Sequence, residues 1–273
     1  MRKGLDPRMI KDGRRALAAA VAVIAPCVPA PLICALVAAA PAQGAPGAPS
    51  RLVVWAWERP EDLRFLPRDV AIAVQTGFVD LVGAGVVARG RRLPLLARPG
   101  QVQTAVVHVQ IDRRTPLAWS PAQRALAARE VLRLAGAVAT PRVQIDFEVA
   151  LSHRRVLLDL LRDVRAGLSS GTQLSMTALA SWCDGEAWLD TAPVDEVAPM
   201  LFRMGPGGQE IRARLSRGGD VSDPRCRQAV AISTDAPIGR APPGRRVYLF
   251  SPRPWTAADF NLVRQEVQAW DAF

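Results

Sequence analysis

The stretch Val143-Gln144-Ile145-Asp146-Phe147-Glu148-Val149 alternates apolar and polar side chains, with one amide and two carboxylates on its polar face. An alternation with period two is typical of a β-strand. The upstream stretch Val107-His108-Val109-Gln110-Ile111-Asp112 repeats the pattern, and a long helical pattern separates the two. A crossover of that length favours parallel strands over a solvent-washed antiparallel pair. In a closed parallel barrel the polar face points inward, and charged groups at the carboxyl ends of the strands form a site.

The rest of the chain continues this alternation of strands and helices. The expected strands are 52–57, 70–74, 104–112, 142–148, 173–179, 197–204, 228–234 and 247–251. The expected helices are 121–137, 151–168, 209–215 and 256–270. Two further expected strands, 77–82 and 86–89, flank Gly83-Ala84-Gly85 and predict a β-hairpin in place of a helix between the second and third barrel strands. We predict an α/β fold, a single-domain (β/α)8 TIM barrel.

The amino-terminal region has the features of an export signal. The first 15 residues carry six basic and two acidic side chains, and residues 16–50 carry no charge. A basic start, an apolar run and the small residues Ala40-Pro41-Ala42 predict a secretory signal. A membrane anchor is the alternative, because the run can span a bilayer, although prolines interrupt it. We expect a signal peptide over 1–42, a linker over 43–51 and the barrel over 52–273. The protein would then be periplasmic or secreted, or anchored to the inner membrane if the signal is not cleaved.

Composition narrows the classes of function. Residues 1–42 hold six of the 35 basic and two of the 25 acidic side chains, so the remainder has a net charge of +6. Its arginines are scattered and no aromatic residues interleave with them, which disfavours nucleic acid as a partner. No glycine-rich phosphate loop follows a strand, which disfavours nucleotides. With only His108 and His153, the sequence offers no zinc constellation, and we expect neither metal nor cofactor. Cys183 and Cys226 can pair in an exported protein, and the sequence leaves that pairing open.

Four segments, in order along the chain, carry a resemblance to a known family. They are Trp55-Ala56-Trp57-Glu58-Arg59-Pro60, 143–148, 174–182 and 194–205. Together they resemble the bacterial domain-of-unknown-function family 3142 over most of residues 52–255. Membership in that family implies an exported barrel, without an established activity.

The chain is also distantly similar to the chitinase-like barrels of glycoside hydrolase family 18. Their fourth strand ends in Asp-Gly-x-Asp-x-Asp-x-Glu, in which the last Glu is the general acid and the Asp two residues earlier assists the substrate acetamide. The resemblance implies these roles for Glu148 and Asp146, while Gln144 and Pro141 replace the two earlier Asp residues. The sixth strand of that family carries Met-x-Tyr-Asp, and this chain has Met200-Leu201-Phe202-Arg203, without the hydroxyl and the carboxylate.

The two carboxylates of the fourth strand have three alternative uses. Asp146 and Glu148 lie two residues apart on one face, so their Cα atoms should be roughly 6.5 Å apart. Like charges that close, partly buried, raise the pKa of one carboxyl, which suits a general acid. The alternatives are acid catalysis on a glycosidic oxygen, ligand binding without turnover, and structural pairing of Asp146 with Arg203 or Arg113.

Other side chains near strand ends complete the expected site. Aromatic rings stack on sugar faces, so Trp57, Trp182 and Trp255 are candidate platforms. The remaining candidate binding residues are Glu58, Asp112, Gln144, Thr177, Met200, Phe202 and Arg203. His108 is expected to be a core histidine bonded to Asp146 or Gln144.

The sequence therefore predicts an exported barrel that recognises a carbohydrate, a cell-envelope or extracellular polysaccharide. If the barrel is an active glycoside hydrolase, Glu148 is its general acid and Asp146 assists. The alternative is a non-catalytic, degenerate hydrolase that binds a glycan or an envelope protein. The replaced Tyr-Asp pair on the sixth strand favours the alternative, and the retained Asp-x-Glu favours the enzyme. We expect a monomer.

Overall fold

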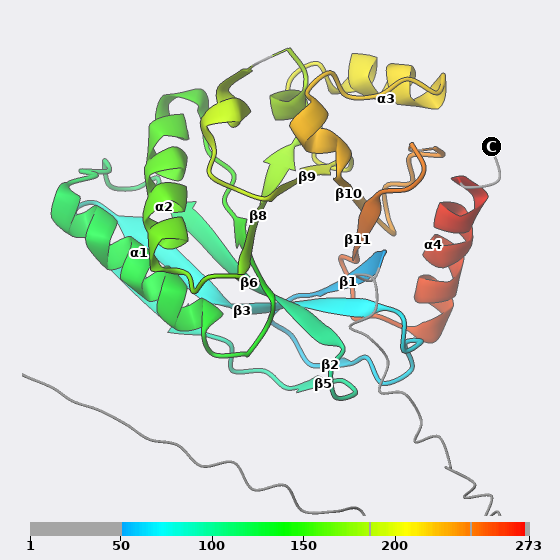
Figure 1. Cartoon of the computed structure of the whole chain (residues 1–273), viewed down its shortest axis with the longest axis horizontal. Helices are drawn as coiled ribbons and strands as arrows, with labels where there is room; N and C mark the ends of the chain where they lie inside the picture. The colour runs from blue at the N-terminus through cyan, green and yellow to red at the C-terminus, as the bar shows by residue number, and fades with distance from the viewer. Residues whose placement is uncertain (1–50, 186, 241, 271–273) are drawn as a thin grey trace, which may run out of the picture. The chain divides into compact units, whose positions relative to one another are not determined.

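Eight parallel strands close into a barrel in this computed structural model. It describes residues 51–185, 187–240 and 242–270, which belong to one compact unit. The strands follow one another around the barrel in the order β1, β3, β6, β7, β8, β9, β10 and β11, and β11 pairs with β1 (Figure 1). With helices outside it, this is an α/β fold of the TIM-barrel-like kind. The predicted signal and all but the last residue of the predicted linker lie outside the described residues.

The elements correspond closely to the segments expected from periodicity. The barrel strands are β1 (Leu52–Ala56), β3 (Ala71–Val82), β6 (Val102–Ile111), β7 (Arg142–Asp146), β8 (Gln173–Leu179), β9 (Glu196–Met200), β10 (Ala229–Ser233) and β11 (Arg246–Phe250). Three further strands are β2 (Glu61–Asp62), β4 (Gly85–Gly90) and β5 (Leu95–Leu96). The α-helices are α1 (Pro121–Ala135), α2 (Arg154–Gly167), α3 (Gly208–Ser216) and α4 (Ala257–Trp270). Short 3-10 helices are η1 (Leu151–His153), η2 (Ala180–Cys183), η3 (Ala187–Thr191) and η4 (Pro224–Arg227).

Period-two alternation sorts the side chains of each strand between the barrel interior and the helices. On β7, Val143 and Ile145 join the apolar layer beneath α1 and α2, which leaves Gln144 and Asp146 on the inner face. The interior cluster combines large rings with small side chains from the strands opposite. Its buried members are Val53, Trp55, Ala71, Ala73, Val106, Ala198, Met200, Ala229, Ala231, Tyr248 and Phe250. The interior is therefore a packed core, filled below its carboxyl end.

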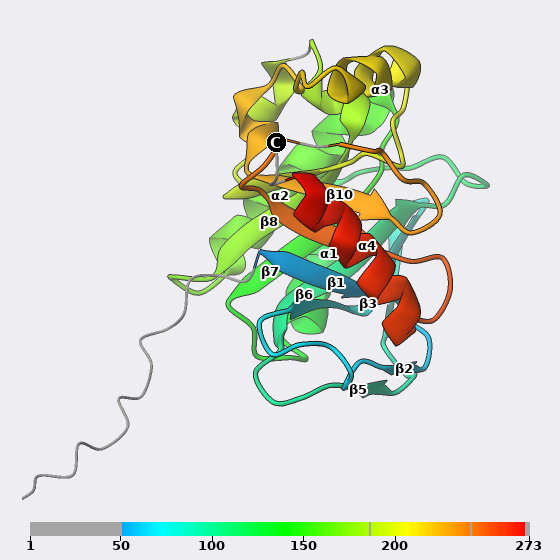
Figure 2. The same ribbon diagram turned by 90° about the vertical axis from the view of Figure 1, so that its right-hand side faces the viewer.

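The helices cover the outside of the barrel with their apolar faces. Helix α1 begins as predicted, because Ser120 accepts a hydrogen bond from the backbone N–H of Gln123 and a proline follows it. Helix α4 lies against the outside of β1 and β11, where Phe260 and Val263 pack into the outer core (Figure 2). Within the described ranges, no helix has the length and apolar character that crossing a membrane requires.

The second barrel strand is longer than its sequence pattern predicted. Residues 70–74 and 77–82 were expected as separate strands, and they form one strand, β3, with a register shift between Gln75 and Gly77. A Cβ at Gly77 would lie 2.6 Å from the Arg89 carbonyl oxygen and 2.7 Å from a methyl carbon of Leu134. The glycine thus lets α1 approach β3 closely and does not end the strand. The antiparallel strand β4 then returns along β3.

A buried ion cluster lies at the amino end of the barrel interior. Glu196 of β9 forms ion pairs with two arginines. Its Oε1 lies 3.0 Å from Arg142 Nη1, and its Oε2 lies 3.3 Å from Arg246 Nε. The Tyr248 hydroxyl donates to Glu196 Oε1 at 2.7 Å. Burial and then the charge of Glu196 raise the pKa of the Tyr248 phenol, which therefore stays a hydrogen-bond donor. The cluster joins β7, β9 and β11 at the end of the barrel opposite the strands' carboxyl ends.

Candidate functional site

Two clefts open at the carboxyl ends of the barrel strands. The first, of about 470 Å³, is called here the aromatic cleft. It is lined by Trp57, Arg59, His108, Asp146, Glu148, Met200, Phe202, Arg203, Ser233, Asp235, Phe250, Ser251 and Pro252. The second, the wide cleft of about 1070 Å³, extends from β3 and β6 to the loop 112–117 and the segment 148–153 that precedes α2. The clefts share His108, Glu148 and Arg203, so these three residues mark their junction.

Asp146 is bonded through both carboxylate oxygens. His108 Nδ1 lies 2.7 Å from Oδ2, and the Thr177 hydroxyl donates to Oδ1 at 2.7 Å. His108 on β6 and Asp146 on β7 are direct neighbours in the strand register. This is one of the two partners expected for His108. The sequence also suggested that Asp146 pairs with an arginine. Its carboxylate instead joins β6, β7 and β8 through one imidazole and one hydroxyl group.

His108 combines a fixed position with partial exposure. Its side chain is 27% exposed, and its ring packs edge-on against Phe78 at a centroid distance of 5.7 Å. Burial alone lowers the pKa of the imidazole, but the hydrogen bond and charge of Asp146, followed by Glu148 and Asp80, outweigh it and raise the pKa above its ordinary value. The three carboxylates therefore favour the charged form of His108, at the junction of the two clefts.

Glu148 lies two residues past the end of β7 and is about one-third exposed. It accepts a hydrogen bond from Arg203 Nε at 2.9 Å, which links the end of β7 to the segment after β9. Among the residues that the structure describes, Arg203 forms no ion pair with Asp146. Glu148 thus reaches the cleft as expected, with one of its two carboxylate oxygens bonded to Arg203.

Aromatic side chains make one wall of the aromatic cleft. Trp57, half-buried just after β1, contacts Trp55 and Phe250 at centroid distances of 5.4 and 5.8 Å. Trp55 stacks on Phe250 at 4.3 Å beneath it, and Phe202 lies 4.9 Å from Phe250. The wall is continuous with the barrel core, so its rings are held in place by packing.

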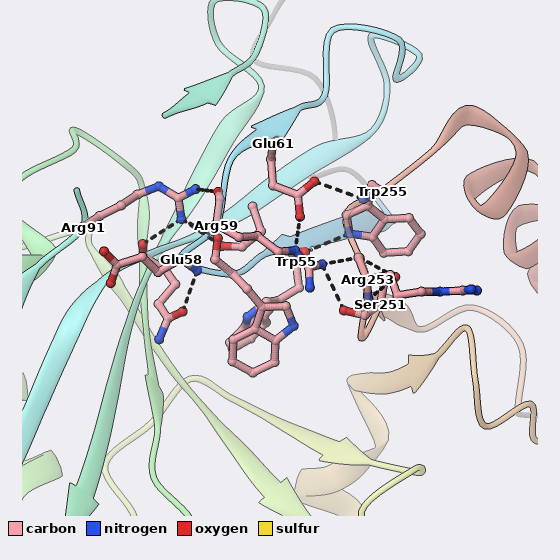
Figure 3. Close-up of polar contacts among 11 residues, drawn as sticks. Trp55, Glu58, Arg59, Glu61, Arg91, Ser251, Arg253 and Trp255 are labelled. Carbon is pink, nitrogen blue, oxygen red and sulfur yellow. Dashed lines mark hydrogen bonds and ion pairs between the residues drawn. The ribbon is translucent and has the colours of Figure 1, made fainter. Parts of the chain in front are cut away.

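A network of charged side chains fixes the loop that carries Trp57. Arg91 donates to the carbonyl oxygens of Trp57 at 2.6 Å and Arg59 at 2.8 Å (Figure 3). Glu61 accepts Arg59 Nε at 2.5 Å and the backbone N–H of Trp255 at 3.0 Å. The loop after β1 is therefore tied both to the segment after β4 and to the segment after β11. No local pattern in the sequence indicates this network.

Two of the three expected aromatic platforms are buried. Trp182 lies in η2, within the core between barrel and helices, and its ring packs edge-on against Trp188 at 5.2 Å. Trp255 donates its indole N–H to the Trp55 carbonyl oxygen at 2.9 Å and packs beneath α4. A stacking platform needs an exposed ring face, so the structure does not support that role for either residue. The turns after β8 and β11 fold these rings inward, and only Trp57 lines a cleft.

The other expected binding residues divide between the clefts and the interior. Met200, Phe202 and Arg203 line the aromatic cleft as expected, and Asp112 lines the wide cleft, where it holds Arg114 at 3.1 Å. Thr177 is buried and supports Asp146.

Gln144 and Glu58 have roles that differ from the expected ones. Gln144 has 0% exposure and lines neither cleft, because it lies one inward position deeper than Asp146. Glu58 lines neither cleft, accepts the Arg92 backbone N–H at 3.0 Å and lies 3.8 Å from Arg89. It is a structural residue of the loop, with partners other than the Arg59 or Arg64 that proximity in sequence suggests.

Some cleft residues were not expected from the sequence. The sequence predicts His108 to be a core residue, because it precedes the end of its strand. Phe250 and Ser233 fall within predicted strands, yet all three residues line the aromatic cleft. Asp235, two residues after the end of β10, also lines the aromatic cleft and accepts a hydrogen bond from Ser233. One feature of the sequence could have indicated His108. The polar residues of β6 alternate as those of β7 do, which places His108 on the inner face beside Asp146.

A disulfide joins Cys183 of η2 to Cys226 of η4. Both residues are fully buried beside Trp182, and the bond closes a loop with a sequence separation of 43. It fastens the segment that follows β8 to the segment that precedes β10.

We expect the paired substitutions Cys183→Ala and Cys226→Ala to lower the free energy of unfolding by about 2–4 kcal/mol, because the unfolded chain regains the freedom that the cross-link removes. Urea unfolding, followed by far-UV circular dichroism, measures the loss. The native chain, unfolded and refolded under reducing conditions, should reach the same lowered stability. An unchanged unfolding midpoint in the double variant would contradict this assignment.

In the part of the chain that the structure describes, no group of three or more His, Cys, Asp or Glu side chains could hold a metal ion. Comparisons with models of protein families, with curated proteins and with solved structures find no match to this chain.

Proposed function

We propose that this barrel is an exported carbohydrate-binding protein whose ligand lies in the aromatic cleft. The observation that carries the proposal is the meeting of a packed aromatic wall with convergent charged groups at the carboxyl ends of the strands. Trp57 offers a partly exposed ring, and Glu148, Arg203 and Asp235 offer donors and acceptors for hydroxyl groups. Sugars present this same combination, with apolar ring faces and polar edges.

The disulfide supports the exported location within this proposal. Disulfides form and persist in oxidising compartments such as the periplasm and the extracellular space. Both cysteines are buried, so their pairing is part of the folded core. We also propose that the fold is a (β/α)8 barrel related to the two families resembled in sequence, with the β3–β4 pair standing in for a helix. The functional proposal does not depend on that relationship.

Hydrolysis of the bound glycan is the second candidate function. It is favoured by Glu148, whose carboxylate is one-third exposed in the cleft beside Asp146. The bonds of these carboxylates to Arg203 and to His108 and Thr177 favour binding without turnover. Binding is therefore the leading proposal, and turnover is a separate outcome of the same test.

We expect Trp57→Ala to weaken glycan binding about two- to tenfold, since a lost aromatic contact is worth about 0.5–1.5 kcal/mol. Glu148→Gln should also weaken it, because Arg203 loses its counter-charge and one carboxylate acceptor oxygen is replaced by an amide NH2. The full chain and both variants are screened on a glycan array, and dissociation constants are then measured by calorimetry. Glu130→Gln on α1, whose partner is Arg133, is the matched control and should bind like the native protein.

Each outcome of this screen decides between candidate functions. Binding that Trp57→Ala weakens supports the proposal, and mass spectrometry of the incubated glycans shows whether any bond is cleaved. Binding that is equal in all four proteins would place the ligand elsewhere. If the native protein binds no glycan, the proposal fails and an envelope protein becomes the partner to seek.

A further inference from the structure

His108 is the side chain that the two clefts share on β6. It lines both, together with Glu148 and Arg203, and a ligand that extends from one cleft to the other must pass it. Neither sequence reasoning nor the resemblance to glycoside hydrolases assigns it a chemical role. Its position is fixed, because Phe78 packs against the ring and Asp146 holds one of its nitrogens.

The hydrogen bonds around Asp146 determine which nitrogen of His108 faces the ligand. Thr177 donates to one oxygen of Asp146, so the other oxygen is left to accept from His108 Nδ1. Nδ1 therefore carries a proton, and the ring presents Nε2 on its far side. Within the described ranges, Nε2 has no hydrogen-bond partner. Thr177 thus orients Asp146, and Asp146 orients the imidazole of His108. Active sites use such a chain to position a side chain that transfers a proton.

We propose that His108 is the proton-transferring residue of this mouth, donating from Nε2 to the glycosidic oxygen of an oligosaccharide that crosses the junction. This inference rests on the proposed function in its hydrolytic form. It gives His108 the acid role that the family resemblance implies for Glu148, and makes Glu148, held by Arg203, the base that accepts a proton from water.

The proposed step conserves atoms and charge. The bond between the anomeric carbon and the glycosidic oxygen breaks, its electron pair goes to that oxygen, and the proton of His108 Nε2 neutralises it. A water molecule bonds to the anomeric carbon and passes its proton to Glu148. One glycosidic bond and one water are consumed and two hydroxyl groups are formed. His108 and Glu148 then return to their starting forms by proton exchange with solvent.

The charges that face His108 suit this role. Asp80 on β3, Asp146 at the end of β7 and Glu148 beyond it all favour the imidazolium. The arginines that line the wide cleft with His108 are Arg113, Arg114 and Arg203. The raised pKa follows from the three carboxylates, which stabilise the protonated donor. The cleavage rate should therefore hold at lower pH and fall as the pH rises through the pKa of His108.

The test uses the full chain and a panel of linear oligosaccharides of neutral, N-acetylated and uronic sugars, with products followed by mass spectrometry from pH 5 to 9. His108→Gln should slow cleavage roughly 100- to 10,000-fold, the usual contribution of a positioned acid or base. Asp146→Asn should also slow it, because the amide loses the charge that holds the imidazolium. The variants' far-UV circular dichroism should match that of the native protein.

A second measurement needs no variant. The chain has only two histidines, so NMR resolves the titration of His108, with His153 as an internal reference. The native cleavage rate should fall as the pH rises, with a midpoint at the pKa that NMR measures for His108. The inference is overturned if His108→Gln cleaves as fast as the native protein. It is also overturned if the native pH profile shows no change at the pKa of His108. Binding without any cleavage overturns it too and leaves the binding proposal standing, whereas absence of binding refutes the proposed function itself.

Discussion

Glu196→Gln is expected to destabilise the protein by about 3–5 kcal/mol, because the substitution removes the shared counter-charge of two arginines. Arg142 is buried and lies 3.0 Å from Glu196, and Arg246 lies 3.3 Å from it. An amide of the same shape leaves both guanidinium groups without the negative charge that offsets their desolvation. Urea unfolding of the native and variant proteins measures the difference in free energy.

The matched control for this prediction is Glu130→Gln, which removes a carboxylate from a surface pair on α1. A surface pair of this kind contributes at most about 1 kcal/mol. Tyr248→Phe is a second comparison, because it removes only the hydrogen bond to Glu196 and should cost about 1 kcal/mol. If Glu196→Gln unfolds at the same urea concentration as Glu130→Gln, the ion cluster does not stabilise the amino end of the barrel.

Trp55→Ala is expected to cost about 3–5 kcal/mol of stability, since it empties the middle of the barrel interior. Trp55 is fully buried, stacks on Phe250 at 4.3 Å and supports Trp57 at 5.4 Å. The rings of the aromatic wall would settle into the space, so ligand affinity should fall along with stability. Chemical unfolding measures the first effect, and calorimetry with the glycan found in the screen measures the second.

Trp55→Phe provides the comparison for the cavity argument. It keeps an aromatic ring against Phe250, and the smaller volume change should give a clearly smaller loss than Trp55→Ala. Equal losses in the two variants, or a loss below about 1 kcal/mol for Trp55→Ala, would mean that the ring does not support the wall of the cleft.

The alternating polar stretches were sufficient to predict the barrel and the location of its mouth. Period two on β6 and β7 identifies the inward positions His108 and Asp146, and these two side chains meet as direct neighbours in register. Gly77 interrupts the alternating pattern of β3, and the sequence does not tell whether such a glycine ends a strand or makes room for a helix. In the structure, Gly77 makes room for α1.

The details of the site depend on long-range contacts that no local pattern encodes. Trp182 and Trp255 follow strand ends as a platform would, but the turns that carry them fold into the core. Arg203 and Glu148 are 55 residues apart in sequence and meet only because β7 and β9 end at the same mouth. Position along a strand indicates the face of a side chain, whereas burial depends on the loops that cover it.

The most direct test of the account is a crystal structure of the native protein with the tightest-binding glycan from the screen. The account predicts a sugar ring against Trp57 and the chain crossing His108 and the Glu148–Arg203 pair toward the wide cleft. A glycan bound away from the carboxyl ends of the strands would contradict the claim that this mouth is the functional site.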